Sequence, residues 1–144
     1  DGEAITNQEL WDIACDWLVP AALGGVIAKE TCARTINCRV VVEAANGPVT
    51  PIGDAILEGD RGIPVLPDFL VNAGGVVVSY FEWVQNLQQH WWSGEQIERE
   101  LLARMQRAYR QVRDLVRSKG IAWRTAAYMI ALDRVAEAER LRGL

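Results

Sequence analysis

The chain has 144 residues, and half of them are hydrophobic, which is enough for the packed core of one domain. The 19 acidic and 15 basic residues give a net charge of −4, which argues against a protein that binds nucleic acid through the phosphate backbone. No apolar stretch is long enough to span a membrane, because the run Ala73–Val78 is short and Glu82 follows it closely.

The first half of the chain alternates strand and helix patterns. Thr6 and Glu9 have capping-box spacing, which predicts a short helix to about residue 13. Apolar or β-branched segments at residues 16–19, 39–43 and 62–66 predict three strands. Residues 29–36 predict one intervening helix, and the Thr50–Pro51 pair predicts the start of another that ends near Leu57. This βαβαβ order predicts a parallel sheet, half of a doubly wound α/β fold.

The second half of the chain reads as helices. Residues 71–89 predict a long apolar helix, interrupted near Gly74–Gly75, and Ser93 with Gln96 predicts the start of a second helix that ends at Gly120. The apolar stripe of this second helix comprises Ile97, Leu101, Met105, Tyr109, Val112 and Val116. In the last helix, residues 123–142, we expect Ala127, Ile130, Ala131, Val135 and Ala138 to face inward. We expect residues 1–70 and 71–144 to form one structural domain, with the helices packed on the sheet.

Candidate binding segments follow all three predicted strands, at residues 20–22, 43–48 and 67–75. Ligands of open parallel sheets bind beyond the carboxyl ends of the strands, and small residues there allow close approach to the backbone. Asn46 and Asn72 each offer a donor and an acceptor, which suits a carboxamide or a ribose hydroxyl. The pattern therefore indicates a nucleotide site. The alternative is that Asn46–Gly47 is only a turn and Gly74–Gly75 only a close helix–strand contact.

Several expected features of a complete dinucleotide enzyme do not occur in this sequence. There is no GxGxxG loop, and Ser79 has no base near it in sequence. The odd number of cysteines, without CxxC spacing, predicts free and mostly buried thiols in a reducing cytoplasm at Cys15, Cys32 and Cys38. With a single histidine, His90, we expect no metal site. We therefore expect the second half of a Rossmann-like sheet from a longer protein.

Residues 72–86 read NAGGVVVSYFEWVQN. This segment resembles the signature of glutamate dehydrogenases, within the glutamate, leucine, phenylalanine and valine dehydrogenase family. It is the most specific segment of the chain, because branched-chain and aromatic amino-acid dehydrogenases share NAGG but not SYFEW. Similar segments cover nearly the whole chain: LVPAA at 18–22, EAANGP at 43–48 followed by Thr50–Pro51, RTAAY at 124–128 and RVAEA at 134–138. The resemblance implies the C-terminal part of a coenzyme-binding domain and the helices that follow it.

The resemblance also implies substrate-binding residues on the helix that begins near Gly75. Ser79 matches the serine whose hydroxyl binds the side-chain carboxylate of glutamate, and Val76 matches the residue that lines the aliphatic part of the substrate. Ser79 lies four residues after Gly75, which places it one turn along the same helix face. The alternative for Ser79 is a hydrogen bond back to a carbonyl of the preceding turn.

The implied cofactor is NAD or NADP. Asn72 matches the asparagine near the nicotinamide carboxamide, and Ala44, Ala45 and Asn46 match the loop beside the nicotinamide ribose. Ala21 and Ala22 match the pair packed against the ribose and pyrophosphate side of the cofactor. The sequence departs from the family at Ala44, where glycine is usual, and at Gly25, where asparagine is usual. Alanine would be strained at position 44 if its φ were positive.

The implied reaction is the oxidative deamination of L-glutamate to 2-oxoglutarate and ammonia. The family's catalytic lysine and aspartate lie in an N-terminal substrate domain, so we expect no catalytic residue in this segment and no activity from it alone. We expect the full-length enzyme to be a cytoplasmic homo-hexamer. Two alternatives remain, a stand-alone non-catalytic module that binds a partner subunit or a nucleotide, and a dehydrogenase for another amino acid.

Overall fold

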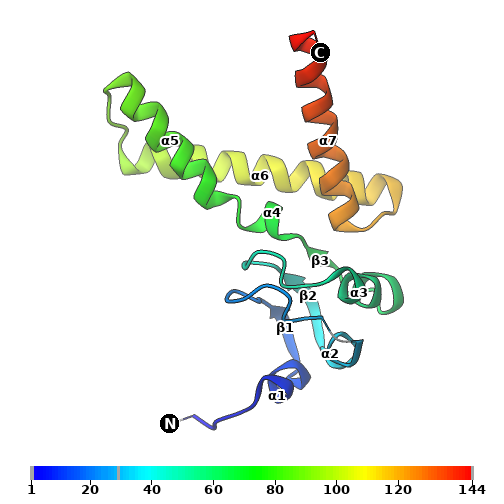
Figure 1. The fold of residues 1–144 in the computed structure, drawn as a ribbon. Coiled ribbons are helices and arrows are strands. Elements are labelled where there is room, and N and C mark those ends of the chain that lie inside the picture. Colours follow the sequence, from blue (N-terminus) through cyan, green and yellow to red (C-terminus); the bar gives the residue numbers. More distant parts are fainter. Residues whose placement is uncertain (1, 29, 144) are drawn as a thin grey trace. The chain divides into compact units, whose positions relative to one another are not determined.

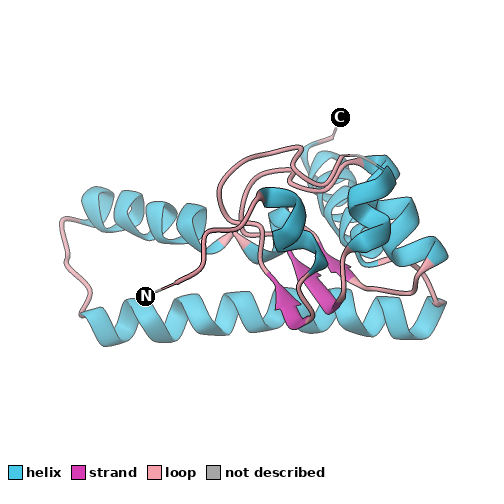
Figure 2. Ribbon diagram, turned by 90° about the horizontal axis from the view of Figure 1, so that it is seen from below, coloured by secondary structure: helices cyan, strands magenta, loops and turns pink. Residues whose placement is uncertain are grey.

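The computed structural model describes residues 2–28 and 30–143, without the side chains of residues 30–32. The chain divides into two compact units, Asp1–Asp68 and Phe69–Leu144. The first unit holds a parallel sheet of three strands in the order β1-β2-β3 (Figures 1 and 2). The strands are β1 (Cys15–Leu18), β2 (Cys38–Val42) and β3 (Val65–Leu66). The predicted α/β class, with a three-stranded half of a doubly wound sheet, is confirmed.

Short helices connect the strands of the first unit. They are α1 (Asn7–Asp12), α2 (Glu30–Thr35), α3 (Pro51–Asp54) and the π-helix η1 (Ala55–Asp60). Thr6 and Glu9 form the predicted reciprocal capping box of α1, and the Thr50 hydroxyl accepts the Gly53 N–H at the start of α3. The hydrophobic core of the first unit is one buried cluster of side chains from its strands, helices and loops: Ile27, Ala33, Ile36, Val41, Val49, Ile56, Leu57 and Val65.

The third strand is shorter than the five residues predicted. Pro64 has no N–H to donate to a ladder, although its carbonyl accepts the Val41 N–H at 3.0 Å. The Ile63 N–H donates instead to the Leu57 carbonyl at 2.7 Å, which closes the end of η1. The helix that precedes the strand therefore runs past the predicted end at Leu57 to Asp60, in π geometry.

Helices make up the second unit, after α4 (Asp68–Val71), which begins at the last residue of the first unit. They are α5 (Gly74–Gln88), α6 (Gly94–Lys119) and α7 (Trp123–Arg142), and α5 and α6 lie alongside each other in both views (Figures 1 and 2). As predicted, the Ser93 hydroxyl caps α6 by accepting the Gln96 N–H, and Gly120 ends the helix. No helix in the described part of the chain is long and apolar enough to cross a membrane.

The predicted interruption near Gly74–Gly75 is confirmed: the break falls at residues 72–73, and the two glycines form the first turn of α5. One prediction for these helices is wrong in part. In α7, Ala127 is buried and Ile130 is half-buried, but Ala131, Val135 and Ala138 are exposed. The apolar spacing of α7 is regular, yet the other helices of the unit cover only its N-terminal half.

The cysteines are free, as predicted, where the structure describes them, but they are only half-buried. Cys15 and Cys38 are register partners on β1 and β2. Burial raises the pKa of the Cys38 thiol, and the neighbouring Cys15 adds to the shift. The side chain of Cys32 lies outside the described residues.

Candidate functional site

In the first unit, two loops follow the carboxyl ends of β1 and β2 and are bonded to each other along their length. We call residues 20–27 the β1 loop and residues 44–49 the β2 loop. The Pro20 carbonyl accepts the N–H groups of Ala44 at 3.1 Å and Ala45 at 2.9 Å. Further along, the Ile27 N–H donates to the Pro48 carbonyl at 2.9 Å. The predicted alanines of the two loops therefore belong to one backbone assembly.

The middle of this assembly depends on two glycines of the β1 loop. The Gly25 N–H donates to the Gly47 carbonyl at 2.8 Å. A Cβ added at Gly24 would lie 2.8 Å from the Asn46 carbonyl oxygen, closer than real Cβ contacts come. Only glycine therefore lets the β1 loop approach Asn46 this closely.

The two departures from the family are accommodated in this backbone. Among the described residues, Gln89 is the one non-glycine residue with a positive φ, so the φ of Ala44 is not positive. The backbone strain that a positive φ would cause at Ala44 is therefore absent. Gly25 has φ of 68°, and no atom lies within 4 Å of the position its Cβ would take. Asparagine tolerates this left-handed conformation better than most residues, so glycine fits where the family usually has asparagine.

A buried carboxylate beneath the β2 loop is a feature that the sequence analysis missed. Glu43 is fully buried, and its two carboxylate oxygens accept the Val49 N–H at 3.1 Å and the Asp68 N–H at 2.8 Å. The Asp68 carboxylate in turn accepts the Gly47 N–H at 2.8 Å. The only sequence signal for this arrangement is an acidic residue placed directly after a β-branched strand.

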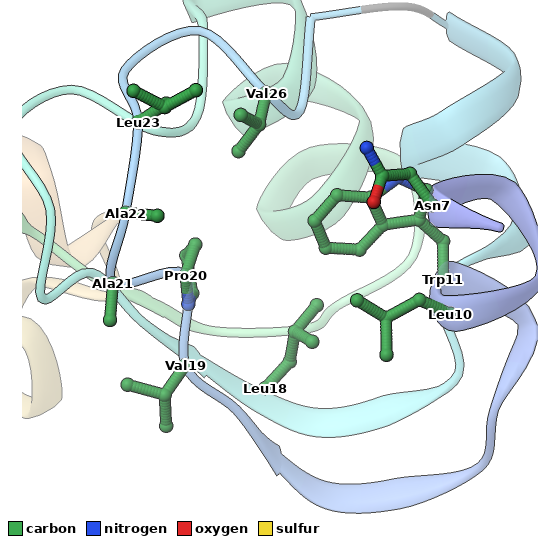
Figure 3. Close-up of a pocket in the computed structure, with 10 residues that line it drawn as sticks. All are labelled: Asn7, Leu10, Trp11, Leu18, Val19, Pro20, Ala21, Ala22, Leu23 and Val26. Atoms are coloured by element: carbon green, nitrogen blue, oxygen red, sulfur yellow. The ribbon is translucent and has the colours of Figure 1, made fainter. Parts of the chain in front are cut away.

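A pocket of about 500 Å³ opens beside the β1 loop (Figure 3). Ala21, Ala22 and Leu23 lie on one side of it, and Trp11 and Leu10 of α1 lie across from them. The other residues that line it are Asn7, Leu18, Val19, Pro20 and Val26. The sequence analysis identified the alanine pair but not the indole wall, because α1 carries no motif that points to a ligand.

The remaining predicted residues belong to the second unit. Gly75, Val76 and Ser79 are all exposed on the first turns of α5, and Asn72 is half-buried just before this helix. No atom lies within 4 Å of a Cβ added at Gly75, and at Gly74 only the Leu101 side chain does, at 3.8 Å. Within the second unit, neither glycine is therefore required by a close contact.

The hydroxyl of Ser79 is exposed on this face. Within the described residues, the structure shows no hydrogen bond from Ser79 to a carbonyl of the preceding turn. Such a bond does form at Ser118 of α6, where Oγ donates to the Leu115 carbonyl at 3.1 Å. The two serines therefore differ, and the face formed by Gly75, Val76 and Ser79 presents a hydroxyl beside an apolar side chain. We call these three residues the α5 face.

The candidate site contains no metal centre within the described part of the chain, where no group of three or more histidine, cysteine or acidic residues is placed to hold an ion. The residues of the candidate site offer backbone groups, small side chains, carboxamides, the Ser79 hydroxyl and the carboxylates of Glu43 and Asp68, which are bonded to backbone N–H groups. Backbone groups, carboxamides and hydroxyls of this kind can bind and orient a polar ligand.

Comparison with known proteins gives a consistent result. Residues 1–143 match the glutamate/leucine/phenylalanine/valine dehydrogenase family. The chain is 51% identical over 140 residues to an NAD-specific glutamate dehydrogenase A of Halobacterium salinarum, covering 97% of this chain and 32% of that protein. It is 48% identical over 141 residues to a cryptic catabolic NAD-specific glutamate dehydrogenase of Bacillus subtilis, covering 98% of this chain and 33% of that protein.

A solved structure shares the fold. The hetero-hexameric glutamate dehydrogenase from Thermus thermophilus, in its leucine-bound form, superposes with a TM-score of 0.88 at 35% identity, covering 97% of this chain and 33% of that one. The chain thus spans about a third of the length of the curated relatives and of the structure it matches.

Proposed function

The chain belongs to the glutamate/leucine/phenylalanine/valine dehydrogenase family, and from that premise we propose that it forms the C-terminal part of the coenzyme-binding domain of an NAD(P)-dependent glutamate dehydrogenase. The observation that carries this proposal is the assembly of the β1 and β2 loops at the carboxyl edge of a parallel sheet, which is where such folds bind nucleotides. The similarity to relatives named as glutamate dehydrogenases supports the choice of substrate.

The residues of the first unit fit a nicotinamide cofactor. Ala21, Ala22 and Asn46 are exposed at the carboxyl ends of β1 and β2, so a ribose or pyrophosphate can approach the backbone there. We propose that Ala44, Ala45 and Asn46 hold the nicotinamide ribose, and that Ala21 and Ala22 pack against the ribose and pyrophosphate side. The relatives named NAD-specific favour NAD over NADP. When bound, the cofactor supplies the acceptor for a hydride from the α-carbon of glutamate.

The residues of the second unit fit an amino acid with a side-chain carboxylate. We propose that the Ser79 hydroxyl donates a hydrogen bond to that carboxylate while Val76 lines the methylene groups, and that Asn72 bonds the nicotinamide carboxamide. All three act by orienting a ligand. Proton transfer falls to a lysine and an aspartate outside this segment, so the segment alone is inactive. We further propose that the complete enzyme is a homo-hexamer.

The test is an assay of the full-length enzyme that we propose contains this segment. We expect glutamate oxidation with NAD, and no glutamate oxidation by the 144-residue chain alone. Oxidation of leucine or phenylalanine in place of glutamate would identify a dehydrogenase for another amino acid. Calorimetric titration of the 144-residue chain tests the binding-module alternative, because an NAD affinity tighter than about 10 μM would show a complete nucleotide site in this segment.

A further inference from the structure

The β2 loop is fixed on both sides of Asn46. On one side, Ala44 and Ala45 donate their N–H groups to the Pro20 carbonyl. On the other side, the Gly47 N–H donates to the Asp68 carboxylate, and the Val49 N–H donates to the Glu43 carboxylate. The exposed Asn46 is thus held between restrained neighbours.

Glu43 organises the second of these restraints. A buried carboxylate is costly unless hydrogen bonds satisfy it, and both of its oxygens accept backbone N–H groups. One bond fixes Val49 directly. The other fixes the backbone of Asp68, whose side chain reaches back to Gly47 at 2.8 Å. Two acidic residues separated by 25 positions therefore bond the backbone of one loop.

This arrangement differs from ordinary core packing. The Glu43 side chain is fully buried, and the two bonds described above join its carboxylate to the backbone of the β2 loop and to Asp68, where α4 begins. Because Asp68 lies two residues after β3, the bond to Asp68 also links the carboxyl ends of β2 and β3. The Glu43 and Asp68 carboxylates shape the loop that carries the proposed ribose-binding residues.

We propose that Glu43 and Asp68 are positioning residues for coenzyme binding, and that their carboxylates set the conformation of the β2 loop in which Asn46 meets the ribose of the nicotinamide. This inference rests on the proposed function and adds to it two residues that touch neither substrate nor cofactor. If this inference is correct, loss of either carboxylate weakens coenzyme binding and leaves the affinity for the amino-acid substrate unchanged.

The test compares Glu43→Gln and Asp68→Ala in the full-length enzyme. Glutamine has one oxygen and an NH₂ group, so one of the two backbone N–H groups at Glu43 loses its acceptor. We expect the KM for NAD to rise at least tenfold in both variants, with kcat and the KM for glutamate changed less than twofold. Asp68→Asn keeps an oxygen that can accept the Gly47 N–H, so we expect its KM for NAD to stay within threefold of the wild type.

A matched control separates positioning from loss of stability. Leu57→Ala removes a fully buried apolar side chain from the core cluster of the same unit and leaves both carboxylates in place. We expect it to lower the melting temperature at least as much as Glu43→Gln, with the KM for NAD unchanged. An unchanged KM for NAD in Glu43→Gln, or an equal rise in Leu57→Ala, overturns the inference.

Failure of the proposed function is distinguishable from failure of this inference. If the wild-type enzyme does not oxidise glutamate, the proposed reaction is wrong, and the same variants are then compared by their NAD dissociation constants from calorimetry. A tenfold weakening in Glu43→Gln and Asp68→Ala, absent in Leu57→Ala, supports the inference. Equal affinities, or no NAD binding by the wild type, overturn it.

Discussion

The two units of the chain present their candidate ligand-binding groups by different means. In the first unit, the β1 and β2 loops are fixed to each other through backbone groups, with Glu43 and Asp68 beneath one of them. In the second unit, the α5 face is a surface of a regular helix, and its three residues are exposed. The loop surface thus depends on hydrogen bonds between residues far apart in the sequence, whereas the helix surface depends only on the helical spacing of its residues.

This difference separates two kinds of mutational effect. A change in the loops alters the backbone that presents the ligand groups, so stability and binding should change together. A change on the α5 face removes a contact with the ligand and leaves the helix intact, because exposed positions contribute little to folding. Loop variants should therefore lower both the melting temperature and kcat/KM, whereas variants of the α5 face should lower kcat/KM alone.

The largest effect is expected at Ser79. A hydroxyl bonded to a carboxylate contributes roughly 1.5–3 kcal/mol, so in the full-length enzyme Ser79→Ala should lower kcat/KM for glutamate roughly 10-fold to 150-fold. The melting temperature should not change, because Ser79 is exposed. The measurement is steady-state kinetics on glutamate and on norvaline, which lacks the side-chain carboxylate.

The control for Ser79 is a second helical serine. Ser118→Ala removes a hydroxyl that bonds the Leu115 carbonyl, outside the α5 face, and should leave both substrates unaffected. Equal losses on glutamate and norvaline in Ser79→Ala would mean that Ser79 supports the helix and does not read the carboxylate.

The next effect should appear in the loops, as a change of stability. Gly24→Ala places a Cβ against the Asn46 carbonyl, which is backbone and cannot move aside cheaply. We expect a loss of about 1–3 kcal/mol in the free energy of unfolding, as for other overpacked sites, together with weaker NAD binding. Chemical denaturation of the 144-residue chain measures the first, and the KM for NAD of the full-length enzyme measures the second.

The neighbouring glycine offers the matched control for this variant. Gly25→Asn introduces a side chain into open space, at a φ that asparagine tolerates. It should alter the free energy of unfolding far less than Gly24→Ala. A larger loss in Gly25→Asn than in Gly24→Ala would contradict the account of the loop assembly.

A smaller effect is expected at Val76. Its side chain is 70% exposed, so Val76→Ala should not lower the melting temperature. If the side chain covers the methylene groups of the substrate, each methyl group removed costs about 0.8 kcal/mol, which predicts a fall in kcat/KM of roughly 4-fold to 15-fold. Leu87→Ala, at an exposed position on the same helix, is the control, and a fall of similar size there would rule out a specific contact.

Much of the fold was predictable, because its signals are local. The capping residues Thr6 and Ser93, the N-cap and proline pair at Thr50–Pro51 and the terminating Gly120 fix the helix ends within a few residues. The α5 face was equally predictable, since Gly75 and Ser79 are one helical turn apart. The exposed C-terminal half of α7 was not, because apolar spacing shows which side chains share a face but not whether another element covers that face.

The loop assembly was predictable only in part. Strand ends rich in small residues located the β1 and β2 loops, but the bonds between Gly25 and Gly47, or between Glu43 and Asp68, join residues 22 and 25 positions apart. Such partners depend on which strands lie side by side, and the capping and spacing signals of single elements do not specify this. The role of Glu43 therefore emerged only from its burial and from the two N–H groups that it accepts.

The smallest effect concerns pH and α1, whose Trp11 lines the pocket beside the β1 loop. The backbone N–H and the hydroxyl of Thr6 both donate to the Glu9 carboxylate, and these bonds hold the pKa of Glu9 below its ordinary value of 4.5. Because the pKa is lowered in the folded state, the stabilisation is fully present above pH 4.5 and is lost as the pH falls through the lowered pKa.

Acidification should therefore fray α1, and loosen the wall of the pocket, before it affects the α5 face. Amide hydrogen exchange of the 144-residue chain between pH 6 and pH 3, corrected for the intrinsic pH dependence of exchange, measures this at Leu10, whose N–H donates to the Thr6 carbonyl at 3.0 Å. Glu9→Gln keeps a side chain that capping boxes accept but does not titrate, so protection at Leu10 should no longer depend on pH. Equal pH dependence of protection at Leu10 in the wild type and in Glu9→Gln would show that a group other than Glu9 controls this helix. The wall of the pocket would then not depend on the specific bonds between Thr6 and Glu9.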